Sequence, residues 1–245
     1  MLKAAMEYLR NLGAAADTPQ VVEIDGHTYC NKSLERYDTP KYADAIYGST
    51  LTALLDYIGS RSDEFPGDMI VHVVSPTRVA LMSGLDAERK RETLFEVNAI
   101  VNEFSFDRWY DQERFMIEMQ ANFAETPDRG AILKMAGNVE RHNGQTFSDN
   151  GTDQVVEMRM GVATKEAVLV PNPVILKPFR TFQEVDQPES AFIFRVGDKE
   201  EPAFKLVEAE NGIWKNTAIG SIKAYLAAEI CKMPVEIHRR ITIIG

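Results

Sequence analysis

The hydrophobic positions at the start of the chain recur at helical spacing. The apolar residues there lie three or four positions apart, at Leu2, Ala5, Met6, Leu9 and Leu12. This spacing places all five on one face of an α-helix. The pattern predicts an amphipathic helix that opens the chain and ends at Gly13.

Four further regions have helical periodicity, and each has a candidate signal at its start or end. Ser49 is placed to cap one helix, and Pro127 is expected to end a second. Asp128 is placed to cap the next helix, and Pro234 to break the last one. The apolar faces of the four predicted helices contain Leu51, Leu54, Leu55 and Ile58; Phe115, Met116, Met119 and Phe123; Ile132, Leu133, Ala136 and Val139; and Ile219, Ile222, Leu226 and Ile230.

Strand patterns occupy much of the remainder. Residues 68–83 read as a β-hairpin, and residues 94–97 fit a strand better than a helix. Residues 235–245 alternate as a last strand that pairs within the subunit or with a neighbour. From residue 143 onward β-branched pairs dominate. Four dipeptides have the composition of hairpin turns, namely Asp25-Gly26, Asn143-Gly144, Asn150-Gly151 and Asn211-Gly212.

These elements predict an α+β fold with mostly antiparallel sheets, amphipathic helices and a strand-rich C-terminal half. The best boundary lies near residue 68. It separates a helix, hairpin and helix region at 1–67 from an α+β domain at 68–245, although one continuous domain fits the sequence as well.

Composition limits the cellular compartments and the kinds of partner that fit this chain. The formal net charge of -10 opposes non-specific binding to a phosphate backbone, which requires clustered Lys and Arg. No apolar run approaches the roughly 20 residues of a membrane-spanning helix, so we expect no membrane association. Cys30 and Cys231 are two isolated cysteines in a chain long enough to fold without a disulfide. We therefore expect reduced thiols and a cytoplasmic location.

The sequence contains no catalytic motif that identifies a reaction. Glycine-rich phosphate loops, a nucleophile elbow and paired metal-ligand motifs are all missing from the sequence. His27 with Cys30 is too small a set for zinc, and a lone His72 inside a strand is typical of packing. Asp149 and Asp153 could hold magnesium but fit a turn better. We therefore assign no catalytic, cofactor-binding or metal-binding residue and expect no cofactor.

One stretch carries a family resemblance. Residues 170–196, "VPNPVILKPFRTFQEVDQPESAFIFRV", contain the segments PFRT at 178–181 and QPES at 187–190. With the order of segments across residues 70–230, they resemble the YfdQ-like family of phage and prophage proteins, a domain of unknown function. The resemblance implies a bacteriophage or prophage origin and action in the cytoplasm of a bacterial host. It implies no catalytic residues.

We therefore favour a non-catalytic protein that self-associates into a ring, tube or shell, or acts as an oligomeric binding module. A host or phage protein is a further candidate partner. The candidate subunit-interface residues are Leu2, Met6, Leu9, Ile241 and Ile243. Two alternatives stay open: an accessory or metal-dependent enzyme of phage nucleic-acid metabolism, and an anti-defence protein that binds a ligand through arginines such as Arg180 and Arg195.

The proline-rich stretch supplies the candidate interaction site. Pro171 and Pro173 cannot donate to a sheet ladder, so this segment should form an extended edge. Arg180 is expected to pair with an acidic group, and Glu184 and Glu189 are the nearby candidates. An internal salt bridge that fixes the turn fits a guanidinium better than a ligand site does, but both interpretations remain open.

Overall fold

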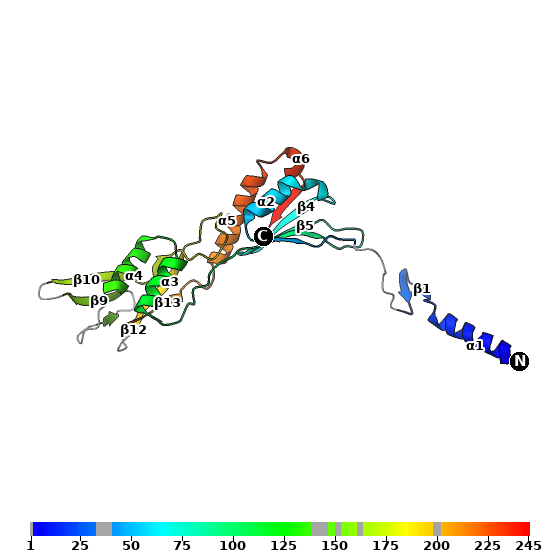
Figure 1. Ribbon diagram of the computed structural model, residues 1–245, viewed down its shortest axis with the longest axis horizontal. Helices are drawn as coiled ribbons and strands as arrows, with labels where there is room; N and C mark the ends of the chain where they lie inside the picture. Colours follow the sequence, from blue (N-terminus) through cyan, green and yellow to red (C-terminus); the bar gives the residue numbers. More distant parts are fainter. Residues whose placement is uncertain (1, 33–40, 139–146, 150–152, 161–163, 198–201) are drawn as a thin grey trace. The chain divides into compact units, whose positions relative to one another are not determined.

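The computed structural model describes residues 2–32, 41–138, 147–149, 153–160, 164–197 and 202–245, with backbone alone at 14–17, 147–149, 153–160 and 164–170. The chain divides into two compact units, Met1–Tyr42 and Ala43–Gly245 (Figure 1). This division falls at residue 42 instead of residue 67. The reason is that the strand and helix between residues 46 and 60 pack with the sheet formed by later residues.

The described residues of the first unit form a helix and a hairpin. Helix α1 covers Leu2–Asp17, and strands β1, Val21–Ile24, and β2, His27–Cys30, pair antiparallel. The turn confirms the prediction, because Asp25 and Gly26 both have positive φ, 53° and 75°. The prediction that Gly13 ends the helix is wrong. Three alanines come after Gly13, and their high helix propensity offsets the cost of one glycine.

The second unit begins with a five-stranded sheet of order β14-β4-β5-β6-β3. Its strands are β3, Ile46–Gly48; β4, Met69–Ser75; β5, Arg78–Ser83; β6, Thr93–Asn98; and β14, Ile241–Ile244. The central strands are antiparallel, whereas β14 joins β4 and β3 joins β6 in parallel. The predicted hairpin at 68–83 and the strand at 94–97 are therefore confirmed.

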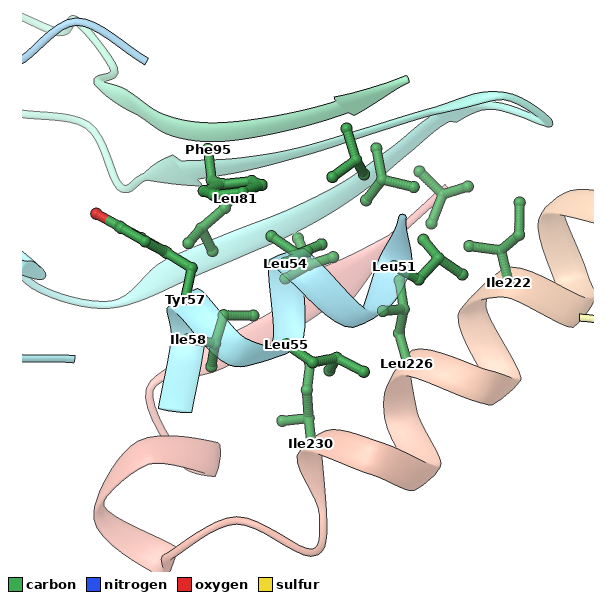
Figure 2. Close-up of a cluster of buried hydrophobic side chains, with 14 of the residues drawn as sticks. Leu51, Leu54, Leu55, Tyr57, Ile58, Leu81, Phe95, Ile222, Leu226 and Ile230 are labelled. Atoms are coloured by element: carbon green, nitrogen blue, oxygen red, sulfur yellow. The ribbon is translucent and has the colours of Figure 1, made fainter. Parts of the chain in front are cut away.

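Helices α2, Leu51–Ser60, and α5, Trp214–Ile230, pack side by side to form the first core with this sheet (Figure 2). Leu54 and Leu226 are among its fully buried residues. Residues Ser62–Glu64 form a 3-10 turn after α2. The side chain of Thr50, and not that of Ser49, caps α2, because its hydroxyl accepts from the Ala53 N–H at 3.2 Å.

A second core lies between a four-stranded sheet and two helices. The sheet has the order β11-β12-β13-β7, with β7 at Tyr110–Asp111, β11 at Val174–Leu176, β12 at Ser190–Gly197 and β13 at Ala203–Glu208. Helices α3, Gln112–Asn122, and α4, Pro127–Asn138, contribute to the core. Phenylalanines dominate it: Phe104, Phe115, Phe123, Phe192, Phe194 and Phe204 are all buried.

A third sheet of three strands has the order β10-β9-β8, with β8 at Phe147–Asp149, β9 at Asp153–Met160 and β10 at Thr164–Pro171. Both of its strand pairs are antiparallel. The predicted turns at Asn143-Gly144 and Asn150-Gly151 lie outside the described residues. The observed sheets confirm the predicted α+β class, with a strand-rich C-terminal half.

Several predicted helix ends are wrong. Pro127 begins α4 instead of ending α3, because α3 already ends at Asn122. Thr126 caps α4 in place of Asp128, accepting from the Arg129 N–H at 3.1 Å. Proline is well suited to the first turn of a helix, where its missing N–H has no partner to lose.

The predicted hairpin at Asn211-Gly212 and the long final strand also differ. Asn211 and Gly212 have the positive φ that was expected, 46° and 77°, but the chain then enters α5 instead of a strand. After Pro234 a short helix, α6, covers Val235–His238, and β14 is confined to four residues. In the described part of the chain, every helix is too short or too polar to cross a bilayer.

Candidate functional site

The proline-rich stretch forms a sheet edge, as predicted. Strand β11 pairs with β12 on one side and ends the order of its sheet on the other. The carboxylate of Asp128 lies at this edge and accepts from the Ile175 N–H at 2.7 Å. A side chain of α4 thus satisfies a backbone donor of the edge strand. The edge strand β11 is therefore less available for pairing with another chain.

Arg180 is the centre of a clasp that joins the ends of three elements. Its Nη1 donates to Glu208 Oε1 at the end of β13, with an N to O distance of 2.8 Å. Its Nη2 donates to the hydroxyl of Ser190 at the start of β12. The guanidinium lies over the Trp214 ring at the start of α5, 3.9 Å from the ring centroid. We call these four residues the arginine clasp.

Burial sets the electrostatics of the clasp. Only 11% of the Arg180 side chain is exposed. Desolvation lowers the pKa of Arg180 to about 10, while the charge and hydrogen bond of Glu208 act in the opposite direction. The guanidinium therefore stays cationic at neutral pH. Its Nε is buried and finds no acceptor among the described residues.

The predicted carboxylate partners of Arg180 have other roles. Glu184 Oε1 accepts from the Thr52 N–H at 3.1 Å, at the first turn of α2. Glu189 pairs with Lys177 at 3.2 Å. Arg180 thus forms an internal salt bridge, as predicted, but its acidic partner is Glu208 and neither of the two predicted glutamates. Because the guanidinium is occupied by protein groups, the sequence-based reason for a ligand site at Arg180 is lost.

Arg195 lies in β12, away from the clasp. In the pairing of β12 with β13, Arg195 stands opposite Lys205. Glu208, the partner of Arg180, stands opposite Phe192, three residues before Arg195 in β12. The structure therefore does not bring Arg180 and Arg195 into one site through the sheet. Glu208 is 28 residues from Arg180 in the chain, and only the strand register could have identified it as the partner.

Gln187 holds the loop that carries Arg180. Its Oε1 accepts from the N–H groups of Arg180 and Thr181 at 3.0 and 3.2 Å, and its Nε2 donates to the Phe182 carbonyl at 3.0 Å. The Thr181 hydroxyl donates to the carbonyl of Pro76, in the turn between β4 and β5. Phe182 belongs to the first core. The PFRT and QPES segments therefore bind this loop to the five-stranded sheet and to the four-stranded sheet.

A groove lies beside this loop, with a cavity volume of about 820 Å³. Asn122 and Thr181 are buried residues in its wall, and Ile100 and Phe179 are exposed large apolar residues there. Glu125 and Asp186 add two exposed carboxylates. Lys177, which pairs with Glu189, also lines the groove. The groove therefore combines apolar side chains with charged ones, on a frame of backbone hydrogen bonds such as Phe179 N–H to Asn122 O at 2.8 Å.

The candidate interface residues fall into two sets. Leu2, Met6 and Leu9 in α1 are 79%, 64% and 66% exposed. Ile241 and Ile243 in β14 pack instead against the first core. The terminal strand pairs with β4 inside the unit, which was one of its two predicted partners, so Ile241 and Ile243 already contribute to the fold.

The described residues contain no group of three or more His, Cys, Asp and Glu side chains that could hold a metal ion. His27 and Cys30 are exposed in β2, and His72 lies in β4. Asp149 and Asp153 end and begin paired strands. The turn between them, residues 150–152, lies outside the described part of the chain.

Comparison with known proteins gives no match: no family model, curated protein or solved structure is significantly similar to this chain. The resemblance to the YfdQ-like family therefore stays a prediction from the sequence. Two surfaces of the chain are candidates for binding a partner, namely the exposed apolar face of α1 and the groove beside the Arg180 loop.

Proposed function

We propose that this is a non-catalytic protein that assembles with copies of itself through its first unit, Met1–Tyr42. One observation carries the proposal. None of the described residues of this unit is buried, although many of them are large and apolar. The phage or prophage origin implied by the YfdQ-like resemblance suits a protein that forms a repetitive assembly.

The energetics favour a partner for this unit. Full burial of a Leu or Met side chain stabilises by about 1.5 to 3 kcal/mol. Leu2, Met6 and Leu9 are about two thirds exposed, so their burial would contribute about 3 to 6 kcal/mol per helix. The hairpin adds exposed Val21 and Ile24. A unit of about 40 residues usually needs a disulfide, a metal or a partner chain to stay folded, and here the partner chain is the best source.

A second copy is the simplest partner, since every copy brings the same apolar face at the same concentration. Closed homo-oligomers are the commonest assemblies of soluble proteins. The net charge of -10 per chain opposes close approach, so assembly should strengthen as salt screens the repulsion. Salt would weaken an assembly held mainly by ion pairs, so this dependence separates the two driving forces.

The test is the mass of the full chain in solution. Sedimentation and light scattering should give a multiple of 27.5 kDa for the natural sequence. The double variant Met6→Gln with Leu9→Gln should sediment as a monomer, because it removes large apolar side chains from the middle of the face. A control with two changes on the polar face, Glu7→Gln with Asn11→Gln, should assemble as the natural chain does.

Two results would contradict the proposal. The natural chain could remain a 27.5 kDa monomer up to high micromolar concentration. Alternatively, the Met6→Gln, Leu9→Gln variant could keep the full assembled mass, which would place the interface elsewhere. The strongest support would be a sedimentation coefficient of the natural chain that rises with salt concentration. This rise should be absent in the Met6→Gln, Leu9→Gln variant and present in the Glu7→Gln, Asn11→Gln control.

A further inference from the structure

The groove beside the Arg180 loop has exposed apolar side chains among polar and charged ones. Ile100 and Phe179 expose large apolar side chains at a cavity of about 820 Å³, within the range of about 300 to 1,000 Å³ that proteins use for ligand pockets. Exposed apolar residues that gather at one concave site are a feature of docking surfaces, whereas singly scattered ones are ordinary. Neither Ile100 nor Phe179 belongs to one of the two cores.

The groove is also preformed. The Ala124 N–H donates to the Lys177 carbonyl at 2.8 Å, and the Phe179 N–H donates to the Asn122 carbonyl at 2.8 Å. These bonds tie the end of α3 to the loop that carries Phe179. A wall fixed by backbone hydrogen bonds loses little conformational freedom when a ligand binds, which lowers the entropic cost of binding.

The apolar stripe of α1 has a border of matching charge. At 100° per residue, Leu2, Met6 and Leu9 share one side of the helix, and Lys3 and Arg10 lie together along the edge next to Met6. Tyr8 lies on the opposite edge of the stripe. The charged residues in the groove lining are Glu125, Asp186 and Lys177, and Lys177 is paired with Glu189. An apolar face with two cations along one side therefore complements the apolar residues of the groove and its carboxylates, Glu125 and Asp186.

We propose that the groove of one copy receives α1 of a second copy. Leu and Met side chains of α1 contact Ile100 and Phe179, while Lys3 and Arg10 lie near Glu125 and Asp186. This inference rests on the proposed self-association and names its docking site. The contact is heterologous, because the two copies use different surfaces, so it builds a ring when the rotation closes and a filament when it does not.

A mixing experiment with full-length variants tests the docking site. The arm variant is Met6→Gln with Leu9→Gln, and the groove variant is Ile100→Ser with Phe179→Ser. Each is expected to be a monomer alone. Mixed in equal amounts, they should form a 1:1 dimer of twice 27.5 kDa, since the groove variant has an intact α1 and the arm variant an intact groove.

A matched control places the same kind of change outside the groove. Ile117 lies on α3, is exposed, and is not among the residues that line the groove. The variant Ile117→Ser should assemble as the natural chain does. Should the groove variant show a lowered melting temperature, the charge reversal Glu125→Lys with Asp186→Lys replaces it, since both side chains are exposed. Lys3→Glu with Arg10→Glu should then restore assembly of that variant.

The outcomes separate this inference from the proposed function. If the groove variant assembles like the natural chain while the arm variant does not, α1 helices pack with one another and the groove is not their site. If both variants are monomers and their mixture stays monomeric, the head-to-tail contact is refuted. If the arm variant assembles alone, the proposed function itself fails.

Discussion

Replacing Arg180 by alanine should destabilise the second unit by about 3 kcal/mol. The change removes the partner of the buried Ser190 hydroxyl, which costs about 1 to 3 kcal/mol. It also removes the stacking on Trp214, worth about 0.5 to 2 kcal/mol. Glu208 is partly exposed, so water can replace its lost hydrogen bond and this contribution stays small.

Urea unfolding followed by far-UV circular dichroism measures this loss. Tryptophan fluorescence is unsuitable as the only probe, because Trp214 itself contacts the substituted residue. Arg61→Ala is the control, since Arg61 is exposed and its nearest carboxylate oxygen, on Glu64, is 3.8 Å away. We expect it to cost less than about 1 kcal/mol. Equal losses for Arg180→Ala and Arg61→Ala would refute the structural role of the clasp.

A second variant separates charge from geometry at the same site. Arg180→Lys keeps a cation near Glu208, but it cannot donate to Glu208 and Ser190 as a planar fork or stack on Trp214 in the same way. It should recover less than half of the loss of Arg180→Ala. Full recovery by lysine would mean that charge alone stabilises the clasp and that the stacked geometry adds nothing.

Two further predictions concern pH and backbone conformation. The hydrogen bond from Arg78 lowers the pKa of Glu96, so the ion pair stabilises the fold above the ordinary pKa of a glutamate and is lost as the pH falls through the folded-state pKa. The natural chain should therefore exceed Glu96→Gln in unfolding free energy at pH 7 and lose this margin as the pH falls below the ordinary pKa of a glutamate and through the lower folded-state pKa; a margin that is constant with pH would contradict the assignment. Gly212→Ala should lower the melting temperature, at a cost of about 1 kcal/mol, because φ at Gly212 is 77°. Gly220→Ala, within α5 and with no neighbour near the added methyl group, should raise it; a shift of the same sign for both variants would mean that backbone conformation does not decide the effect.

Local signals predicted the elements that depend on local chemistry. Asp25-Gly26 predicted a tight turn because both residues tolerate positive φ, and the structure has that turn. Asn211-Gly212 has the same backbone but precedes a helix, because the dipeptide determines only the turn. The element after such a turn is decided by whether its apolar residues reach a core as a strand or as a helix. Ile222 and Leu226 do so as a helix.

Long-range pairing explains the features that the sequence did not reveal. Strand β14 joins β4 in parallel, with Ile241 opposite Met69, and no pattern in residues 241–244 encodes a partner so far away in the chain. The same holds for Arg180 and Glu208. The two residues meet because β12 and β13 pair in a register that puts Glu208 opposite Phe192. Sequence spacing favoured Glu184 and Glu189, which are near in the chain but bind other groups.

The segment that carries the family resemblance has two sides with different consequences. Arg180 and Phe182 point into the protein's own contacts, whereas Phe179, Gln183 and Asp186 are exposed at the groove. A match of the inner residues to another protein would therefore report a shared fold, and only the outer residues could report a shared partner. The distinction is measurable. Changes on the inner side should lower the unfolding free energy and, because they disturb the groove wall, also reduce assembly. Changes on the outer side should reduce assembly and leave the unfolding free energy of the monomer unchanged.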